Sequence, residues 1–232
     1  MKIENSVVLV TGGNRGLGKA LVDEALARNA RKVYAAARDP KTVTNPDAIP
    51  LRLDVTDPES IAAAAREAGD VAVLINNAGV TANANLLTGD IGEIRSEFEI
   101  NFYGPLYVTR AFAPIIVGNG GHLLNVLSVM SWLATGRSYS ATKAAFWSMT
   151  NGLRLDLAPQ GVGVTGLHVG YIDTDLAAHI DAPKISPEDV ARQAIDGIEN
   201  GAFEVLADEV TRKVKRGLSA DPSALYPQLA TE

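Results

Sequence analysis

The 232-residue chain contains no cysteine, which excludes disulfide bonds and thiolate metal sites and makes the reducing cytoplasm the expected location. It has no run of about 18 apolar residues, so no membrane-spanning helix is expected. The opening stretch, "MKIENSVVLVT", has too short an apolar run for a signal peptide. A formal net charge of −6 gives no reason to expect nucleic acid or an anionic membrane as a partner. The three histidines are scattered without metal-ligand spacing, so no metal site is expected.

Short apolar runs recur along the chain with amphipathic or alanine-rich segments between them. Most runs are nearly continuous in Val, Leu, Ile and Ala, as strands buried on both faces require. They occupy residues 6–11, 32–37, 50–55, 71–76, 122–127, 162–169 and 203–207. Asp57 and Ser186 each precede a proline, the pattern of a helix N-cap. The alternation predicts an α/β fold: a single doubly wound Rossmann domain, with a parallel sheet of about seven strands and helices on both faces. The end of the chain, 219–232, looks irregular.

A glycine-rich turn, "TGGNRGLG", follows the first apolar run directly. Gly12, Gly16 and Gly18 allow a tight turn, a close approach of backbone to a phosphate and close packing of the next helix. The exposed N–H groups at the start of that helix can bind a pyrophosphate. The spacing G-x-x-x-G-x-G departs from the strict G-x-G-x-x-G fingerprint, and a plain strand-to-helix connection is the alternative. The position after the first strand of a βαβ pattern favours a dinucleotide site.

Two arginines predict which dinucleotide is bound. In such folds a residue about 20 positions past the last glycine meets the adenosine ribose, and here that residue is Arg38, at the end of the second strand. A guanidinium there favours the 2′-phosphate of NADP(H), whereas a carboxylate favours the free hydroxyls of NAD. Arg15, in the glycine turn, forms the other side of the clamp; two solvated surface arginines are the alternative. Asp39 is the ribose ligand if the register is off by one, but we expect it to cap the segment after it.

Tyr139 and Lys143 lie one turn apart on one face of a segment, 138–157, that has helical periodicity. A free tyrosine has a pKa of about 10, too high for efficient proton transfer near neutrality. A nearby ammonium favours the phenolate and lowers that pKa. The pair therefore suits a general acid that protonates an oxygen as hydride arrives at the adjacent carbon. An incidental Tyr/Lys pair on an amphipathic helix is the alternative.

Six motifs occur in one order: the "TGGNRGLG" turn, "LDV" at 53–55, "NNAG" at 76–79, Asn101 in "EINFYG", Ser128 in "NVLSVMS", and Tyr139 with Lys143 in "YSATK". Together they resemble the classical short-chain dehydrogenase/reductase family across essentially the whole chain. The basic glycine turn followed by "AAARD" is most similar to the NADP-preferring carbonyl-reductase type. The resemblance implies one domain over 1–232, in which 1–120 mainly binds the cofactor, 121–200 holds the catalytic and substrate-binding part, and 201–232 forms the last strand, a helix and a tail.

The resemblance also implies a role for each matching residue. Tyr139 is the expected proton donor or acceptor, and Lys143 lowers its pKa and holds the nicotinamide ribose. Ser128 hydrogen-bonds the substrate oxygen and stabilises developing alkoxide charge. Asn101, in the fourth helix, holds water that links Lys143 to solvent. The expected cofactor-binding residues are Gly12, Asn14, Arg15, Gly16, Leu17, Gly18, Arg38, Asp54, Val55, Asn77, Ala78, Gly79, Tyr139, Lys143, Gly170, Ile172 and Thr174.

The sequence departs from the family pattern at two places. Tyr139 lies 11 positions after Ser128, one or two fewer than in most members, which makes Ser131 a rival for the serine role. The end of an apolar strand in "NVLS" favours Ser128. In "HVGYIDTD", Val169 stands where the family usually has proline, which puts the local backbone in question.

The substrate pocket is expected after Ser128 and after Gly170, where apolar and aromatic side chains suit a hydrophobic ketone or aldehyde, or the corresponding alcohol. Its expected walls are Met130, Trp132, Leu133, Tyr171 and Leu176. Two other functions stay open: a cofactor-binding sensor or scaffold without chemistry, and reduction of a carbon–carbon double bond, for which Tyr and Lys are more widely separated in enoyl reductases. A homodimer or homotetramer is expected through the helices of Asn101 and Tyr139, the second of which carries Phe146, Trp147 and Met149.

Overall fold

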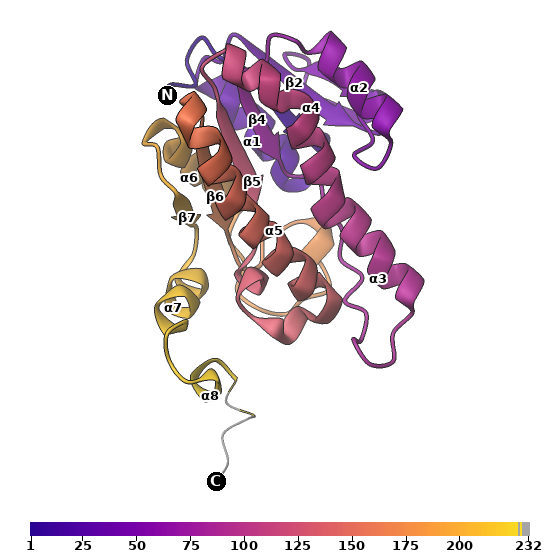
Figure 1. Ribbon diagram of the computed structural model, residues 1–232, viewed down its shortest axis with the longest axis vertical. Helices are drawn as coiled ribbons and strands as arrows, with labels where there is room; N and C mark the ends of the chain where they lie inside the picture. The colour runs from indigo at the N-terminus through magenta and orange to yellow at the C-terminus, as the bar shows by residue number, and fades with distance from the viewer. Residues whose placement is uncertain (227, 229–232) are drawn as a thin grey trace.

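The computed structural model describes residues 1–226 and 228. Seven parallel strands form one sheet in the order β3-β2-β1-β4-β5-β6-β7 (Figure 1). They are β1 (Val7–Thr11), β2 (Lys32–Ala37), β3 (Ile49–Arg52), β4 (Val73–Asn76), β5 (His122–Val126), β6 (Gly163–His168) and β7 (Glu204–Leu206). Each strand overlaps one predicted run, and the predicted fold class is confirmed. The strand order reverses between β1 and β4, and open α/β sheets bind their ligands at such a switch point.

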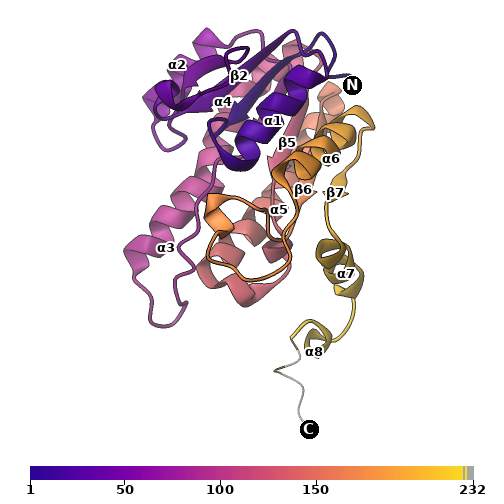
Figure 2. The same cartoon turned by 180° about the vertical axis from the view of Figure 1, so that it is seen from behind.

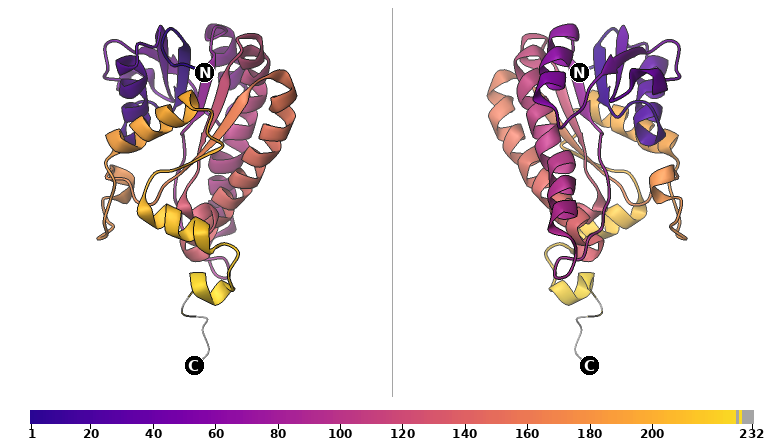
Figure 3. Two further views of the ribbon diagram at one scale, coloured as in Figure 1. Left: turned by 90° about the vertical axis from the view of Figure 1, so that its left-hand side faces the viewer. Right: turned by 90° about the vertical axis from the view of Figure 1, so that its right-hand side faces the viewer.

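Helices cover both faces of the sheet. The structure has α1 (Gly16–Ala27), α2 (Pro58–Glu67), α3 (Ile91–Phe98), α4 (Gly104–Gly118), α5 (Arg137–Leu157), α6 (Pro187–Glu199), α7 (Glu209–Gly217) and α8 (Pro222–Leu225). The edge-on views show α1 and α6 on one face and α2, α4 and α5 on the other (Figure 3). In the part of the chain that the structure describes, no helix has the length and apolar character needed to cross a membrane.

The two faces of the sheet have separate apolar cores, which explains why the strands are apolar at nearly every position. Val8 and Val10 of β1 pack in the core beneath α1 and α6, the two helices that lie in front of the sheet in Figure 2. Val7 and Leu9 pack in the core beneath α2 and α4. All four are essentially inaccessible to solvent, and burial of a side chain of this size contributes roughly 1.5–3 kcal/mol.

The helices after Asp57, Ser186 and Asp39 begin with the capping residues that the sequence predicts. Asp57 accepts a hydrogen bond from Glu59 N at the start of α2, and Ser186 caps α6 in the same way. Asp39 caps the short 3₁₀ helix after it, as expected. The expectation that 219–232 is irregular is wrong for α8, because Asp221 caps this helix through Ser223 N; residues 227 and 229–232 lie outside the described residues.

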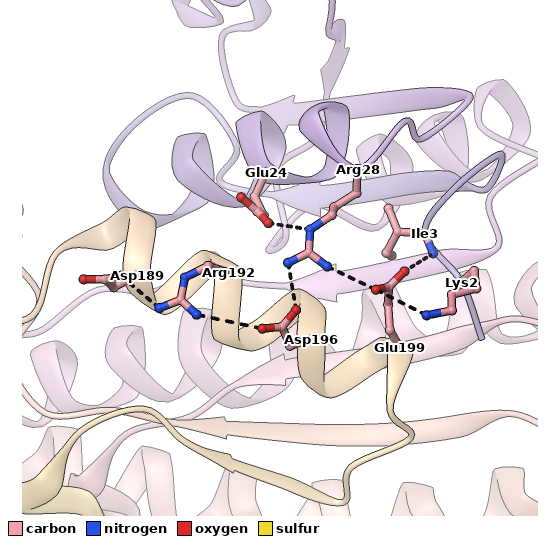
Figure 4. Close-up of polar contacts among 8 residues, drawn as sticks. All are labelled: Lys2, Ile3, Glu24, Arg28, Asp189, Arg192, Asp196 and Glu199. Carbon is pink, nitrogen blue, oxygen red and sulfur yellow. Dashed lines mark hydrogen bonds and ion pairs between the residues drawn. The ribbon is translucent and has the colours of Figure 1, made fainter.

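Ion pairs join α1 to α6 at the end of the sheet where the strands begin (Figure 4). The Arg28 guanidinium, on the residue that follows α1, contacts Glu24 at 2.8 Å, Asp196 at 2.7 Å and Glu199 at 3.1 Å. The carboxylates of Asp196, first, and of Glu24 raise the pKa of Arg28. Glu199 also accepts a hydrogen bond from Ile3 N, so the network ties the start of the chain to both helices.

Candidate active site

Most of the predicted site residues lie at the carboxyl edge of the sheet, because they follow the ends of parallel strands. The glycine turn (12–18) follows β1 and Arg38 follows β2. Gly79 lies just after β4, Ser128 after β5 and Gly170 after β6. Five segments that are far apart in the sequence therefore meet at one edge.

The glycine turn has the geometry of a phosphate site. Gly12 and Gly16 have φ angles of 65° and 51°, which glycine adopts without strain. A Cβ at Gly18 would lie 2.0 Å from the carbonyl oxygen of Gly12, so no larger residue fits there. Arg15, at the N-cap of α1, makes no capping hydrogen bond with its side chain, so the first N–H groups of the helix lack a capping side chain. Such N–H groups bind phosphate, so the turn fits the pyrophosphate of a dinucleotide.

Residues after β4 hold this turn in place. Thr11 Oγ1 accepts hydrogen bonds from Asn77 N at 2.9 Å and Ala78 N at 3.0 Å. The Asn77 side chain donates to the Thr11 carbonyl at 2.9 Å. Asn77 therefore fixes the glycine turn to β4, and Thr11 is a supporting residue that sequence reasoning missed. A Cβ at Gly79 would come within 3.2 Å of Asn101 Oδ1 and 4.0 Å of Lys143 Nζ.

Arg15 and Arg38 are exposed, and within the described ranges neither has an ion-pair partner. The pKa of Asp54 is lowered, first by its hydrogen bond from Thr56 N and also by the charge of Arg38. Arg38 and Asp54, which follow neighbouring strands, are thus electrostatic neighbours at the adenosine end of the predicted site.

The side chains of three other predicted cofactor residues are engaged within the protein. Asn14 donates to Thr42 Oγ1 at 3.0 Å, which links the glycine turn to the segment after Arg38. Leu17 is buried in the core beneath α1. Val55 is buried against α4, where a Cβ on Gly104 would lie 2.8 Å from Val55 Cγ2. For Asn14 and Leu17 the backbone is therefore the part that is free to face a cofactor.

The Tyr139–Lys143 pair lies in the first two turns of α5. Lys143 Nζ lies 5.7 Å from the centre of the Tyr139 ring and donates a hydrogen bond to Val126 O at 2.9 Å. Burial lowers the pKa of Lys143 to about 8 and raises the pKa of Tyr139 to about 12. The pKa of Tyr139 was expected to be lowered, but in this structure it is raised, because the effect of burial is larger than the effect of the neighbouring groups. The Ser128 hydroxyl acts in the opposite direction on the phenol and lowers its pKa.

Asn101 lies in a π-helical turn, Glu99–Tyr103, between α3 and α4, and so just before the fourth helix in which it was expected. It is buried, and it accepts a hydrogen bond from Val80 N and donates one to Val80 O, both at 2.9 Å. It also donates to Thr142 Oγ1 on α5 at 3.1 Å. The turn is closed by Gly104 N, which donates to Glu99 O. π-Helical turns occur frequently at functional sites.

Ser128 and Ser131, the two candidates for the serine role, form a capping pair. Ser128 Oγ accepts from Met130 N at 3.1 Å, while Ser131 Oγ accepts from Ser128 N at 3.4 Å. Both are buried. Ser128 is the one that lowers the pKa of Tyr139, and this effect favours Ser128 over Ser131.

The segment after β6 runs from the catalytic side of the site to the glycine turn. Val169 is buried and its carbonyl accepts a hydrogen bond from Val129 N at 2.9 Å, so valine fits this position as a core residue. Gly170 N donates to Asp208 Oδ2 at 2.6 Å. At the far end, the methyl group of Thr174 would lie 3.3 Å from a Cβ on Gly16. Ile172 pairs with Ile185 in an isolated bridge that closes the segment.

The predicted pocket walls fall into two groups. Leu133 is half-buried, while Tyr171 and Leu176 are exposed at the carboxyl edge. Trp132 instead packs inside the protein: its ring stacks on His168 at 4.0 Å, and Lys215 Nζ of α7 lies 4.7 Å from the ring centre. These contacts favour an interior role for Trp132. Half-buried Met130 accepts a weak hydrogen bond at its sulfur from Thr135 Oγ1.

Two acids at the site were missed by sequence reasoning. Asp208 caps α7 and binds Gly170 N, a contact across 38 residues that no local pattern reveals. Glu97 is buried, accepts a hydrogen bond from Ala82 N, and lies four residues before Asn101. The one-turn spacing between Glu97 and Asn101 is a signal that could have identified Glu97.

Comparison with known proteins gives a family match over most of the chain. The model of the short chain dehydrogenase family matches residues 6–184. An uncharacterized oxidoreductase of Staphylococcus saprophyticus is 30% identical over 231 residues, covering 91% of this chain and 98% of that protein.

Two solved structures share the whole fold. A short chain dehydrogenase from Burkholderia cenocepacia, in complex with NADP, is 39% identical with a TM-score of 0.94 and covers 100% of both chains. A short chain dehydrogenase/reductase from Burkholderia phymatum, in complex with NAD, is 24% identical with a TM-score of 0.82 and covers 93% of both chains. The second likeness concerns the fold alone.

Proposed function

The chain belongs to the short-chain dehydrogenase family of oxidoreductases, and on that premise we propose that it is an NADP(H)-dependent carbonyl reductase, which interconverts a hydrophobic ketone or aldehyde and its alcohol. The observation that carries the proposal is the arrangement of Tyr139, with Lys143 one turn along α5 and the Ser128 hydroxyl acting on the phenol. Asn101 lies behind this group in the π-helical turn.

The side chains support a proton transfer coupled to reduction. When bound, the nicotinamide ring supplies the hydride. Ser128 and Tyr139 hold the carbonyl oxygen through their hydroxyl groups, and Tyr139 donates its proton to that oxygen. With a pKa of about 12 the phenol is protonated at neutral pH, which suits a donor and therefore the reductive direction. Lys143, whose pKa of about 8 lies close to neutrality, can exchange the proton that reloads the phenol.

The environment of Arg38 supports NADP(H) over NAD(H). Asp39, the competing ribose ligand, is engaged as a helix cap, which favours the register that places Arg38 at the ribose. Arg15, the basic residue of the glycine turn, is the second candidate to bind the 2′-phosphate. A hydrogen bond to a charged group is worth about 1.5–3 kcal/mol, so one such contact with the 2′-phosphate gives roughly ten- to a hundredfold discrimination. The relative from Burkholderia cenocepacia with NADP points the same way.

The exposed apolar side chains at the carboxyl edge of the sheet support a hydrophobic substrate. Tyr171 and Leu176 are 40% and 53% exposed after β6, and half-buried Leu133 lies in the segment after Ser128. Apolar walls with few charges bind ketones and aldehydes better than sugars or carboxylic acids.

A substrate panel tests the proposed function directly. Oxidation of NADPH, followed by its absorbance, is measured with hydrophobic ketones, aldehydes and enones, and again with NADH. We expect turnover with ketones or aldehydes and a preference for NADPH. Turnover of enones alone would identify an enoyl-type reductase. Tight NADPH binding without any turnover would identify a cofactor-binding sensor.

Self-association is a further part of the proposal. The apolar side chains of α5 were expected to support self-association, but two of them are engaged inside the protein. Phe146 is buried in the core, and the Trp147 indole donates a hydrogen bond to Glu204 at 3.1 Å. The support comes from other residues: Tyr103 and Tyr107 stack at 6.0 Å with both rings exposed, and Leu155 on α5 is 76% exposed. We propose a homodimer or homotetramer whose interface covers these side chains. Light scattering at micromolar concentration measures the mass of the particle and so tests this part of the proposal.

A further inference from the structure

Glu97 is a buried acid beside the catalytic group, and the proposed mechanism does not use it. It lies in the last turn of α3 and is 1% exposed. Oε1 accepts a hydrogen bond from Ala82 N at 2.7 Å, but Oε2 has no hydrogen-bond partner among the residues that the structure describes. An unpartnered carboxylate oxygen in the interior is costly, so such a group calls for an explanation.

The groups that respond to the charge of Glu97 are Tyr139 and Lys143 on α5, the helix packed against α3. Glu97 raises the pKa of both. The loop packed against α3, 77–89, contains no ionisable side chain. On the π-helical turn the ionisable residues are Glu99 and Tyr103, and neither is buried. Glu97 is therefore the one buried acid within the described part of these elements, and its charge acts on both members of the Tyr139–Lys143 pair.

Glu97 also holds the loop that follows Gly79. Glu97 and Asn101, one helical turn apart, accept hydrogen bonds from Ala82 N and Val80 N respectively. The loop next to Gly79, close to Lys143 Nζ, is thus held by two side chains of one helix. Oε1 of the Glu97 carboxyl group thus binds the loop at Ala82 N, whereas the charge of the group, with Oε2 unpartnered among the described residues, can act on the Tyr139–Lys143 pair.

We propose that Glu97 is a positioning residue of the active site, whose buried carboxylate balances the charge of Lys143 and couples helix α3 to the proton transfer by Tyr139. Its structural contact and its charge can be separated. Glu97→Gln keeps an oxygen that accepts from Ala82 N and removes the charge, whereas Glu97→Asp keeps the charge on a shorter side chain. Glu93→Gln, at an exposed acid of the same helix, is the matched control.

The first test follows Lys143 itself and does not depend on turnover. The ¹³Cε signal of labelled lysine, assigned with Lys143→Arg, is titrated by NMR. In Glu97→Gln we expect the pKa of Lys143 to fall below that of the wild type by on the order of one unit, the effect of removing an opposite charge that acts on the buried ammonium. Glu93→Gln and Glu97→Asp should titrate close to the wild type. An unchanged Lys143 titration in a folded Glu97→Gln protein, as judged by circular dichroism, would overturn the proposal.

The second test rests on the proposed function and measures the pH profile of carbonyl reduction. Tyr139 must be protonated to donate, so kcat falls as the pH rises through its pKa. Glu97 raises that pKa, so Glu97→Gln should move the falling limb to lower pH. A lower kcat with an unmoved limb would mean that Glu97 is only structural. If no carbonyl is reduced by the wild type, the proposed function fails and the NMR titration alone decides the role of Glu97.

Discussion

The two edges of the sheet treat charge in opposite ways. At the amino edge, Arg28 contacts three carboxylates, and Lys32 and Tyr34 share the carboxylate of Asp70. At the carboxyl edge, Lys143 is buried with a single hydrogen bond to a carbonyl oxygen, and Arg38 has no ion-pair partner among the described residues.

The contrast has a thermodynamic meaning. Pairing raises the pKa of Arg28 and so favours its charged form, which stabilises the fold. Burial moves the pKa of Lys143 to about 8, which costs stability and leaves a group that exchanges a proton near neutrality. Charges that are fully paired serve the fold, and charges that lack partners are available to a ligand.

The largest effect is expected where the carboxyl edge loses its proposed proton donor. Tyr139→Phe should retain NADPH binding but reduce carbonyl turnover by about 10²–10⁴-fold, the usual contribution of general acid–base catalysis. Single-wavelength assays give kcat, and NADPH fluorescence gives the binding constant. Near wild-type turnover of a good ketone by this variant would remove Tyr139 from the catalytic role.

The two serines of the capping pair offer a matched comparison within the carboxyl edge. Ser128→Ala should lower kcat by roughly 10²–10³-fold, as loss of a donor to a developing oxyanion does. Ser131→Ala, which removes only an acceptor for Ser128 N, should have a much smaller effect. The measurement is kcat for both variants with one ketone. Equal losses, or a greater loss for Ser131→Ala, would show that Ser131 has the catalytic role.

Removal of the unpaired arginine should change cofactor choice and leave the fold unaffected. Arg38→Ala is expected to lower kcat/KM for NADPH by roughly ten- to a hundredfold and to leave the value for NADH nearly unchanged. Adding Ala37→Asp should move the preference towards NAD, because a carboxylate repels the phosphate and binds the ribose hydroxyls. Both cofactors are measured at one ionic strength, since salt screens this recognition. Equal use of NADH by the wild type would instead point to Asp39.

The smallest effect is expected at the amino edge. Arg28→Ala should leave kcat unchanged and lower the free energy of unfolding by about 1 kcal/mol, near the upper end for partly exposed ion pairs. For a chain of this length that corresponds to a fall in Tm of about 2–4 °C, read by thermal unfolding. Arg38→Ala is the control and should not lower Tm. A loss of activity without a fall in Tm in Arg28→Ala would contradict the division between the two edges.

The sequence was sufficient for features that depend on local pattern. The apolar runs predict all seven strands, because the strands contribute side chains to the cores on both faces of the sheet. Asp57, Ser186 and Asp39 cap the helices that follow them. Contacts between distant segments could not be read in this way. Asp208 reaches Gly170 only because β6 and β7 are neighbours.

Burial was the second quantity that the sequence did not reveal. The spacing of Tyr139 and Lys143 gives their proximity, but the pKa of the phenol depends on how much solvent the fold removes from it. Trp132 looks like a pocket wall by composition, yet its stacking on His168 follows from β6 lying beside β5. Helical periodicity likewise implies a regular helix around Asn101 and misses the π-helical turn.

That turn sets the helical phase of two segments in one continuous helix, 91–118. Each residue added to a helix rotates everything beyond it by about 100°. The extra residue lets Glu97 and Asn101 face the loop while Val108 and Phe112 of α4 face the sheet. A regular α-helix over the same residues would give α4 a different rotation relative to Glu97 and Asn101. The irregular turn therefore lets one helix pack α4 against the sheet and also hold the loop beside Gly79 through Glu97 and Asn101.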